Sequence, residues 1–119
     1  MEKCVFFCDD DADILDICRI ILEQEGIKVI TCSTAETLHS SLADCTPHLI
    51  FIDNGLAGIT GHELISHLKR NEQYKSIPVV LFSANSEIEA MAQTSSADGW
   101  LAKPFDIKDL KTTVWNYLN

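Results

Sequence analysis

The sequence predicts an α/β protein with a doubly wound, five-stranded parallel sheet and helices on both faces. Short apolar runs alternate with segments of helical spacing five times, and the connections between them are short. The run from Leu49 to Ile52 is apolar throughout, which is typical of a strand buried on both faces of a parallel sheet. It ends at Asp53, before the turn dipeptide Asn54-Gly55. The 119 residues have the length of one domain, so we expect residues 1–119 to form a single unit.

The first half of the chain contains three of the expected strands, at residues 5–8, 27–31 and 49–53. Between the first two, a helix is predicted with Asp13 as N-cap, Asp16 in its first turn and Gly26 as its stop signal. Its apolar stripe consists of Ile14, Leu15, Ile17, Cys18, Ile21 and Leu22. A weaker helix over residues 34–44 is capped by Ser33 or Thr34.

The second half begins with a loop marked by Gly55, Gly58 and Gly61. A helix follows with Leu64, Ile65 and Leu68 on its inner face, and then a strand over residues 77–82. Residues 87–94 form a helix with a sparse apolar face, and residues 99–102 form the fifth strand. The last helix carries the stripe Ile107, Leu110, Val114, Tyr117 and Leu118.

The composition excludes several classes of partner. The net charge is −9, whereas nucleic acids and anionic membranes are bound by clustered lysine and arginine. No apolar run reaches transmembrane length, and the N-terminus has no signal-peptide cleavage site. The five cysteines contain no C-x-x-C pair, which favours reduced, buried thiols. We therefore expect a cytoplasmic protein without direct nucleic-acid contact or membrane insertion.

Polar residues follow four of the five predicted strands. Asp9 and Asp10 follow the first strand, Asp53 ends the third, Ser83 the fourth and Lys103 the fifth. Right-handed connections bring these ends to one edge of the sheet. Carboxylates about 4 Å apart would repel by roughly 4 kcal/mol per pair at an effective dielectric of 20. A hard cation such as Mg²⁺ would relieve that repulsion, and the hydroxyl and ammonium suit a phosphoryl group.

Asp53 is the most central carboxylate and therefore the candidate nucleophile, since carboxylates form aspartyl phosphates. Each residue also has a structural interpretation. The acidic run from Asp9 to Asp13 suits a helix N-terminus, Ser83 suits an N-cap, and Lys103 suits a solvated loop. The functional interpretation is favoured because all of them fall at the same end of different strands.

Four motifs occur in the order found in one family: Val5–Leu15 with its acidic pair, Asp53, Ser83-Ala84, and Trp100–Phe105 with its Lys-Pro-Phe ending. With these motifs the chain resembles the receiver domain of two-component response regulators, the CheY-like proteins, over essentially its whole length. The resemblance implies a flavodoxin-like (βα)5 fold with strand order 2-1-3-4-5. It implies a signalling domain, not an enzyme beyond its own phosphorylation and slow dephosphorylation.

The resemblance also implies roles for individual residues. Asp53 would be the phospho-acceptor. Asp10, Asp53 and the carbonyl of Gly55 would bind Mg²⁺ or Mn²⁺ directly, with Asp9 acting through water. Lys103 and the Ser83 hydroxyl would contact the phosphoryl oxygens, beside the supporting residue Ala84. Pro104 would follow Lys103 through a cis peptide bond.

Switching is implied in the same way. Ser83 turns toward the phosphoryl group, Trp100 swings inward, and the surface of residues 87–118 changes for a protein partner or a homodimer. The phosphoryl donor would be a histidine kinase or a histidine phosphotransfer protein. Three positions depart from the family: Ala57 replaces a usual proline, Trp100 a usual tyrosine or phenylalanine, and Ser83 a usual threonine.

Two other interpretations stay open from the residues alone. A receiver-like module that binds partners without phosphorylation would be expected to lose acidic or lysine positions, and none is lost. In a haloacid-dehalogenase-type phosphatase, Asp9 would be the nucleophile and Asp11 the general acid, which leaves Asp53 unexplained. Nucleotide binding lacks its glycine-rich motifs.

Overall fold

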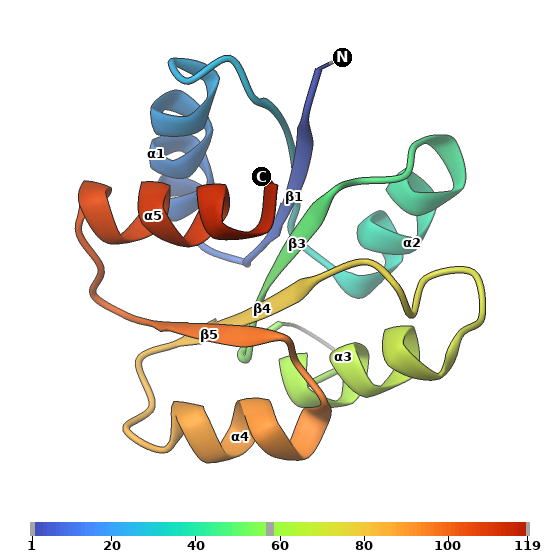
Figure 1. Cartoon of the computed structure of the whole chain (residues 1–119). Coiled ribbons are helices and arrows are strands. Elements are labelled where there is room, and N and C mark those ends of the chain that lie inside the picture. Colours follow the sequence, from blue (N-terminus) through green and yellow to red (C-terminus); the bar gives the residue numbers. More distant parts are fainter. Residues whose placement is uncertain (1, 57–58, 119) are drawn as a thin grey trace.

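A computed structural model shows the architecture of the chain and describes residues 2–56 and 59–118 (Figure 1). Within these residues one parallel sheet has the order β2-β1-β3-β4-β5. Its strands are β1 (Cys4–Cys8), β2 (Lys28–Cys32), β3 (Leu49–Asp53), β4 (Val79–Ser83) and β5 (Gly99–Ala102). The fold class and strand order predicted from the sequence are confirmed, with the bounds of β1, β2 and β4 shifted by one or two residues.

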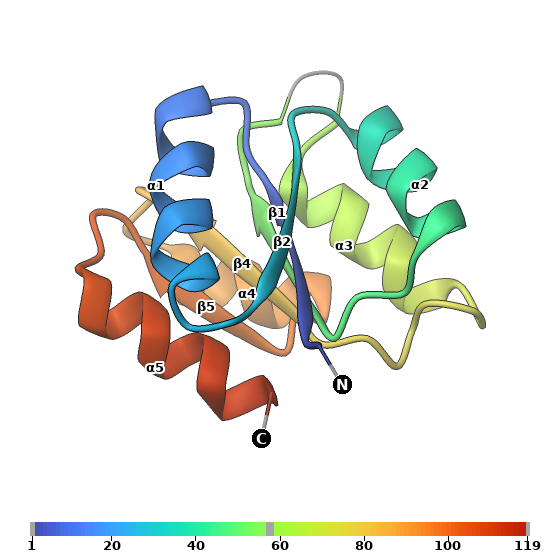
Figure 2. The ribbon, with the colours of Figure 1, turned by 90° about the horizontal axis from the view of Figure 1, so that it is seen from above.

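Helices cover both faces of the sheet (Figures 1 and 2). One face carries α1 (Ala12–Glu23) and α5 (Ile107–Leu118). The other face carries α2 (Ala35–Asp44), α3 (Gly61–Arg70) and α4 (Ile88–Ser95). Because side chains alternate along each strand, the sheet separates two cores. Figure 2 shows α1 and α5 on one side of the strands and α2 and α3 on the other.

The two cores differ in their side chains. Under α1 and α5, the rings of Phe7 and Phe51 stack with centroids 4.3 Å apart, and Phe82 meets both edge-on. Under α2, α3 and α4 the buried strand residues are four aliphatic side chains, three cysteines and Phe6. β1, β3 and β4 are buried along their whole length, as the apolar run of β3 predicts.

The N-caps of the first two helices show that the predicted cap of α1 was wrong and identify the cap of α2. The N-cap of α1 is Asp11, whose Oδ1 accepts hydrogen bonds from the amides of Asp13 and Ile14. Asp13 is therefore a first-turn residue, and Asp16 lies beyond that turn. Gly26 follows the helix with a φ of +79°, as its role as a stop signal predicts. Thr34, not Ser33, caps α2 and forms a capping box with Thr37.

Two residues of the predicted apolar stripes lie on the surface. Ile17 is 55 % exposed and Ile107 is 56 % exposed. The buried face of α1 is formed by Leu15, Cys18, Ile21 and Leu22, and this stripe turns Ile17 outward. Ile107 is the first residue of α5, and the buried contacts of that helix begin only at Leu110. The sequence pattern did not distinguish these two from core positions.

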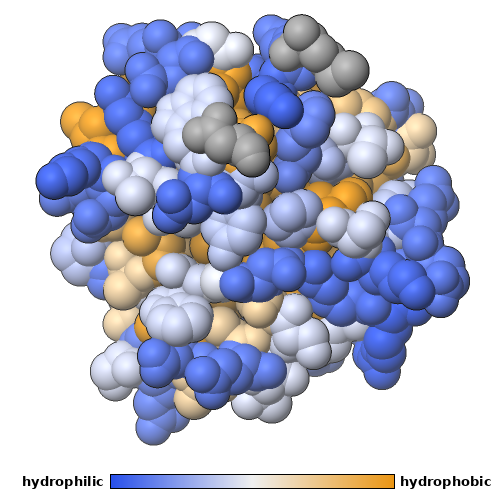
Figure 3. Space-filling model, viewed as in Figure 1, coloured by the Kyte–Doolittle hydropathy of each residue, from blue (hydrophilic) through white to orange (hydrophobic). Residues whose placement is uncertain are grey.

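The face of the molecule in Figure 3 is predominantly hydrophilic. In Figure 3 hydrophilic residues cover most of the visible face, and hydrophobic residues appear there only as small patches. Among the described residues, every helix is too short or too polar to cross a membrane. Ala57 and Gly58, which the sequence placed in the loop after β3, lie outside the described residues.

Candidate functional site

The carboxyl ends of the strands bring the predicted polar residues to one edge of the sheet. Asp9 and Asp10 directly follow β1, Asp53 is the last residue of β3, and Ser83 is the last residue of β4. Lys103 directly follows β5, and its amide donates to the Ser83 carbonyl at 2.9 Å. Because the strands are parallel, residues 9 to 103 meet here although they are far apart in sequence.

Three carboxylates form the centre of this edge. Asp9, Asp10 and Asp53 each place an oxygen within 4.8 Å of the others. Asp9 is 1 % exposed and Asp53 is 8 % exposed, while Asp10 is exposed. Backbone amides fix the two buried groups: Asp11 donates to Asp9 Oδ1 and Gly55 to Asp53 Oδ2, both at 2.9 Å. These bonds hold both side chains in place at this edge of the sheet.

Lys103 joins the two buried carboxylates. Its Nζ donates to Asp9 Oδ2 at 2.7 Å and to Asp53 Oδ1 at 2.8 Å. The same ammonium lies 4.6 Å from the centre of the Phe82 ring. Burial alone would lower the pKa of Lys103, but the hydrogen bonds and charges of Asp53 and Asp9 outweigh it and hold the pKa above its usual value. Lys103 is therefore a cation in this site.

The chemistry of these donors fits a hard divalent cation. All three side chains offer carboxylate oxygens, and the acidic groups outnumber the lysine by three to one. Mg²⁺ prefers oxygen ligands and is bound in proteins through one or two carboxylates plus waters and phosphate oxygens. Asp9, Asp10 and Asp53 are the residues that could hold such an ion.

Three other predicted residues flank the cluster. The Ser83 hydroxyl accepts a hydrogen bond from the Asn85 amide at 3.1 Å, and Ala84 lies between these two residues. The peptide bond from Lys103 to Pro104 is cis, as the resemblance implied. Trp100 lies on β5 and is 43 % exposed. Gly55 contacts Asp53 through its amide, so the role of its carbonyl stays a prediction.

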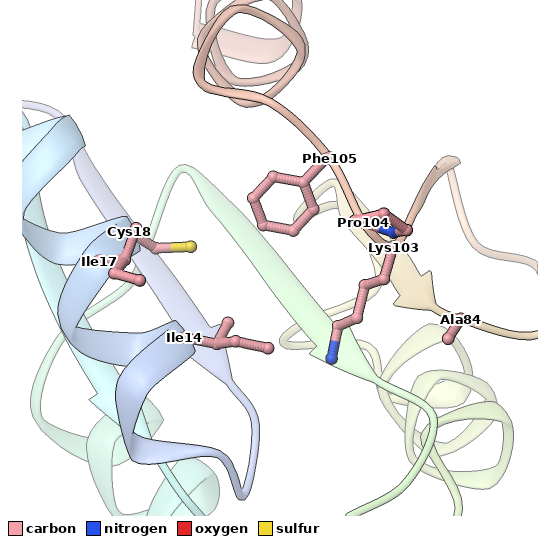
Figure 4. Close-up of a pocket in the computed structure, with 7 residues that line it drawn as sticks. All are labelled: Ile14, Ile17, Cys18, Ala84, Lys103, Pro104 and Phe105. Carbon is pink, nitrogen blue, oxygen red and sulfur yellow. The ribbon is translucent and has the colours of Figure 1, made fainter.

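A pocket of about 330 Å³ opens beside the lysine and was not predicted from the sequence. It is lined by Ile14, Ile17 and Cys18 of α1 and by Ala84, Lys103, Pro104 and Phe105. Figure 4 shows the Lys103 ammonium pointing toward the carboxyl end of β3, with the α1 residues across the opening from Phe105. The sequence carried no signal for this pocket, because Ile17 falls within the predicted apolar stripe of its helix and only the structure shows it exposed.

The sequence did not predict the hydrogen bonds that join the residue after Asp53 to the start of α3. The Asn54 carbonyl accepts the Gly61 amide at 3.0 Å, and Asn54 Oδ1 accepts the His62 amide at 3.3 Å. A Cβ at position 61 would lie 2.6 Å from the Asp53 carbonyl oxygen. Glycine is therefore required for this close approach, which fixes the backbone of Asp53 against the start of α3.

Comparison with known proteins identifies the family of the chain. The family model of the response regulator receiver domain matches residues 5–115, and the chain belongs to this family. The phosphate regulon transcriptional regulatory protein PhoB of Escherichia coli (strain K12) is 31 % identical over 116 residues, covering 96 % of this chain and 51 % of PhoB. Protein PilG of Pseudomonas aeruginosa is 28 % identical, covering 89 % of this chain and 80 % of PilG.

The solved structures show the same fold. The chemotaxis response regulator CheY4 of Vibrio cholerae superposes with a TM-score of 0.90 at 23 % identity, covering 98 % of this chain and 99 % of CheY4. The chain spans about half the length of PhoB and similar curated relatives that it matches. Membership in the receiver family is thus shown by sequence and fold, and the residue roles follow as proposals.

Proposed function

We propose that the chain takes a phosphoryl group onto Asp53 from the phosphohistidine of a histidine kinase or a histidine phosphotransfer protein. One observation carries this proposal: the Asp53 carboxylate lies at the end of the central strand, paired with a lysine ammonium and within 4.8 Å of two further carboxylates. A carboxylate oxygen of Asp53 attacks phosphorus, the phosphorus–nitrogen bond breaks, and the leaving imidazole takes up a proton.

The surrounding residues prepare Asp53 for this step. The Gly55 amide and Lys103 Nζ bond different oxygens of its carboxylate and so fix its orientation. Asp9 holds the other side of the lysine at 2.7 Å, which keeps the ammonium beside the acceptor. Asp10 and Asp53 would hold Mg²⁺, with Asp9 acting through water. The bound ion supplies positive charge for the transferred oxygens.

Phosphorylation is proposed to change the surface formed by α4, β5 and α5. The Ser83 hydroxyl would turn toward the phosphoryl group, and Trp100, now 43 % exposed, would move inward. Support comes from the thin packing of α4, whose buried side chains are Ile88, Ala92 and Ser95. A protein partner in the cytoplasm, or a second copy of the chain, would read the changed surface.

The acceptor is tested by intact mass after incubation with a small acyl phosphate, with and without Mg²⁺. Wild type is expected to gain one phosphoryl group only with Mg²⁺, and Asp53→Asn none. Asp44→Asn, at the exposed end of α2, is the matched control and should label normally. Labelling of Asp53→Asn to the same extent, or labelling mapped to Asp9, would contradict the proposal; the latter would favour a phosphatase.

Lys103 is tested by Lys103→Ala in a Trp115→Phe background, where Trp100 is the remaining indole. Mg²⁺ should still raise the melting temperature of the variant, because its carboxylates are intact. The change in Trp100 fluorescence on phosphorylation should be lost, because the cation that links β5 to Asp53 is gone. A normal fluorescence change would show that Lys103 does not couple the site to β5.

The second candidate is an interaction module that works without phosphorylation. Absence of any mass gain in folded wild type, under conditions that label an ordinary receiver, would favour it. The buried ion pairs of Asp9 and Asp53 with Lys103 argue against it, since a binding surface has no need of them.

A further inference from the structure

Two of the five cysteines have their thiols in contact at the amino-terminal edge of the sheet, opposite the candidate site. Cys4 Sγ and Cys45 Sγ are 3.8 Å apart. Cys4 is the first residue of β1, and Cys45 follows α2 as its C-cap. All five cysteines are free thiols, and the receiver function uses neither member of this pair.

The backbone on both sides of this contact is fixed. The Cys4 amide donates to His48 Nδ1 at 3.1 Å, and the His48 amide donates to the Cys4 carbonyl at 2.8 Å. The Cys45 amide donates to the Ser41 carbonyl at 3.0 Å. A disulfide has a sulfur–sulfur distance of about 2.05 Å, so closing the gap requires small side-chain movements within a fixed frame.

The two thiols differ in their access to solvent. Cys45 is half-buried, while the other four cysteines are buried. Burial, together with the hydrogen bond to Cys45, raises the pKa of Cys4 to about 12. A reagent in solution therefore reacts first with Cys45, and the buried Cys4 thiol reacts second.

We propose that Cys4 and Cys45 form a reversible intramolecular disulfide with low-molecular-weight disulfides as oxidant. The Cys45 thiolate attacks one sulfur of the small disulfide, forming a mixed disulfide and releasing one small thiolate. Cys4 gives its proton to solvent and attacks Cys45 Sγ, which releases the second small thiolate. Both cysteines are oxidised, and the small disulfide is reduced to two thiols.

The bond would connect two segments of the fold that are 41 residues apart in sequence. The closed loop contains β1, α1, β2 and α2, and cross-linking it restricts the unfolded chain. The bond lies at the edge of the sheet away from Asp53 and Lys103. Oxidation is therefore expected to stabilise the fold while the phospho-acceptor site stays intact.

The chain contains its own controls. Cys8 and Cys32 are register partners on β1 and β2 but are 0 % and 1 % exposed, and Cys18 on α1 is 1 % exposed. Cys45→Ser removes the reactive thiol at a half-buried position, and Cys18→Ser leaves the same number of cysteines. Both variants are checked for folding by their thermal transitions before oxidation.

The experiment treats folded wild type, Cys45→Ser and Cys18→Ser with oxidised glutathione and measures intact mass and a non-reducing peptide map. Wild type and Cys18→Ser should lose two hydrogens, show a Cys4–Cys45 cross-link and melt higher by about 5 °C or more. Dithiothreitol should reverse all three changes. Cys45→Ser should show none of them.

Three results would overturn the proposal: a stable glutathione adduct on Cys45 of wild type without cross-linking, no reaction at Cys45, or an equal mass loss in Cys45→Ser. Acyl phosphate labelling of the oxidised wild type separates this proposal from the receiver function. Normal labelling without a cross-link would reject the disulfide alone, and a cross-link without labelling would reject the receiver function alone.

Discussion

Lys69 and Lys103 lie at opposite edges of the same sheet and bind different partners. At the amino-terminal edge, Lys69 Nζ donates to the Ile77 carbonyl at 2.8 Å, to the Lys75 carbonyl at 3.3 Å and to Asp98 Oδ2 at 2.6 Å. At the carboxyl-terminal edge, Lys103 Nζ donates to Asp9 at 2.7 Å and to Asp53 at 2.8 Å.

The charge around each lysine separates a structural cluster from a functional one. Lys69 faces one carboxylate and two neutral carbonyls, so its charge is matched and its three donors are used. Lys103 faces a group of three carboxylates, so the carboxyl-terminal edge keeps an excess of negative charge. A cluster with matched charges is costly to break by removing one partner, whereas an unmatched one is suited to binding a cation.

The largest effect on stability is expected for Lys69→Met, which keeps the aliphatic stem but removes the ammonium. The change removes the ammonium from two carbonyls and from Asp98, which keeps its hydrogen bond from the Val79 amide at 2.7 Å, and the Lys69 side chain is only 14 % exposed. We expect the free energy of unfolding to fall by about 3 kcal/mol, less than for a fully buried pair because Asp98 is 39 % exposed. Urea unfolding measures this change.

If Lys69 is purely structural, acyl phosphate should label Lys69→Met at Asp53 to the same extent as wild type. Lys75→Met is the matched control, since Lys75 pairs with Glu72 on the surface with its side chain 52 % exposed. This control should unfold at nearly the wild-type urea concentration. Equal stability of Lys69→Met and Lys75→Met would remove the distinction between the two edges.

A smaller effect is expected for Gly61→Ala, which probes the backbone behind Asp53. The added methyl group would lie 2.6 Å from the Asp53 carbonyl oxygen and 2.7 Å from the Asn54 Cα, so the backbone must shift. We expect a loss of about 2 kcal/mol in unfolding free energy and slower labelling of Asp53. Ser66→Ala, in the middle of α3, is the control; normal stability and labelling of Gly61→Ala would show that the close approach is unimportant.

The fold and the residues of the candidate site were predictable because both leave local signals. Each strand is a short apolar run, and the polar residues at strand ends fall at one sheet edge in any right-handed parallel sheet. Asp9, Asp10, Asp53, Ser83 and Lys103 were placed at one edge by this rule alone. The cis bond before Pro104 came from the family resemblance, because a sequence motif and not a physical pattern predicted it.

The features that were missed depend on contacts between distant residues. Lys69 and Asp98 are 29 residues apart, and the sequence pattern places Lys69 on the polar face of its helix. The contact of Cys4 with Cys45 has the same origin, since nothing in the cysteine spacing predicts it. The N-cap of α1 could not be predicted because the run of acidic residues offers both Asp11 and Asp13, and only the backbone conformation shows where the helix begins.

The excess charge at the carboxyl-terminal edge is tested most directly by melting temperature against Mg²⁺ for wild type, Asp10→Asn and the control Asp44→Asn. Without Mg²⁺, Asp10→Asn should melt slightly higher than wild type, because one of three repelling carboxylates is neutral. With Mg²⁺, wild type and Asp44→Asn should rise together and Asp10→Asn should rise much less. Equal Mg²⁺ responses in all three proteins, or none in wild type, would contradict a cation site at this edge.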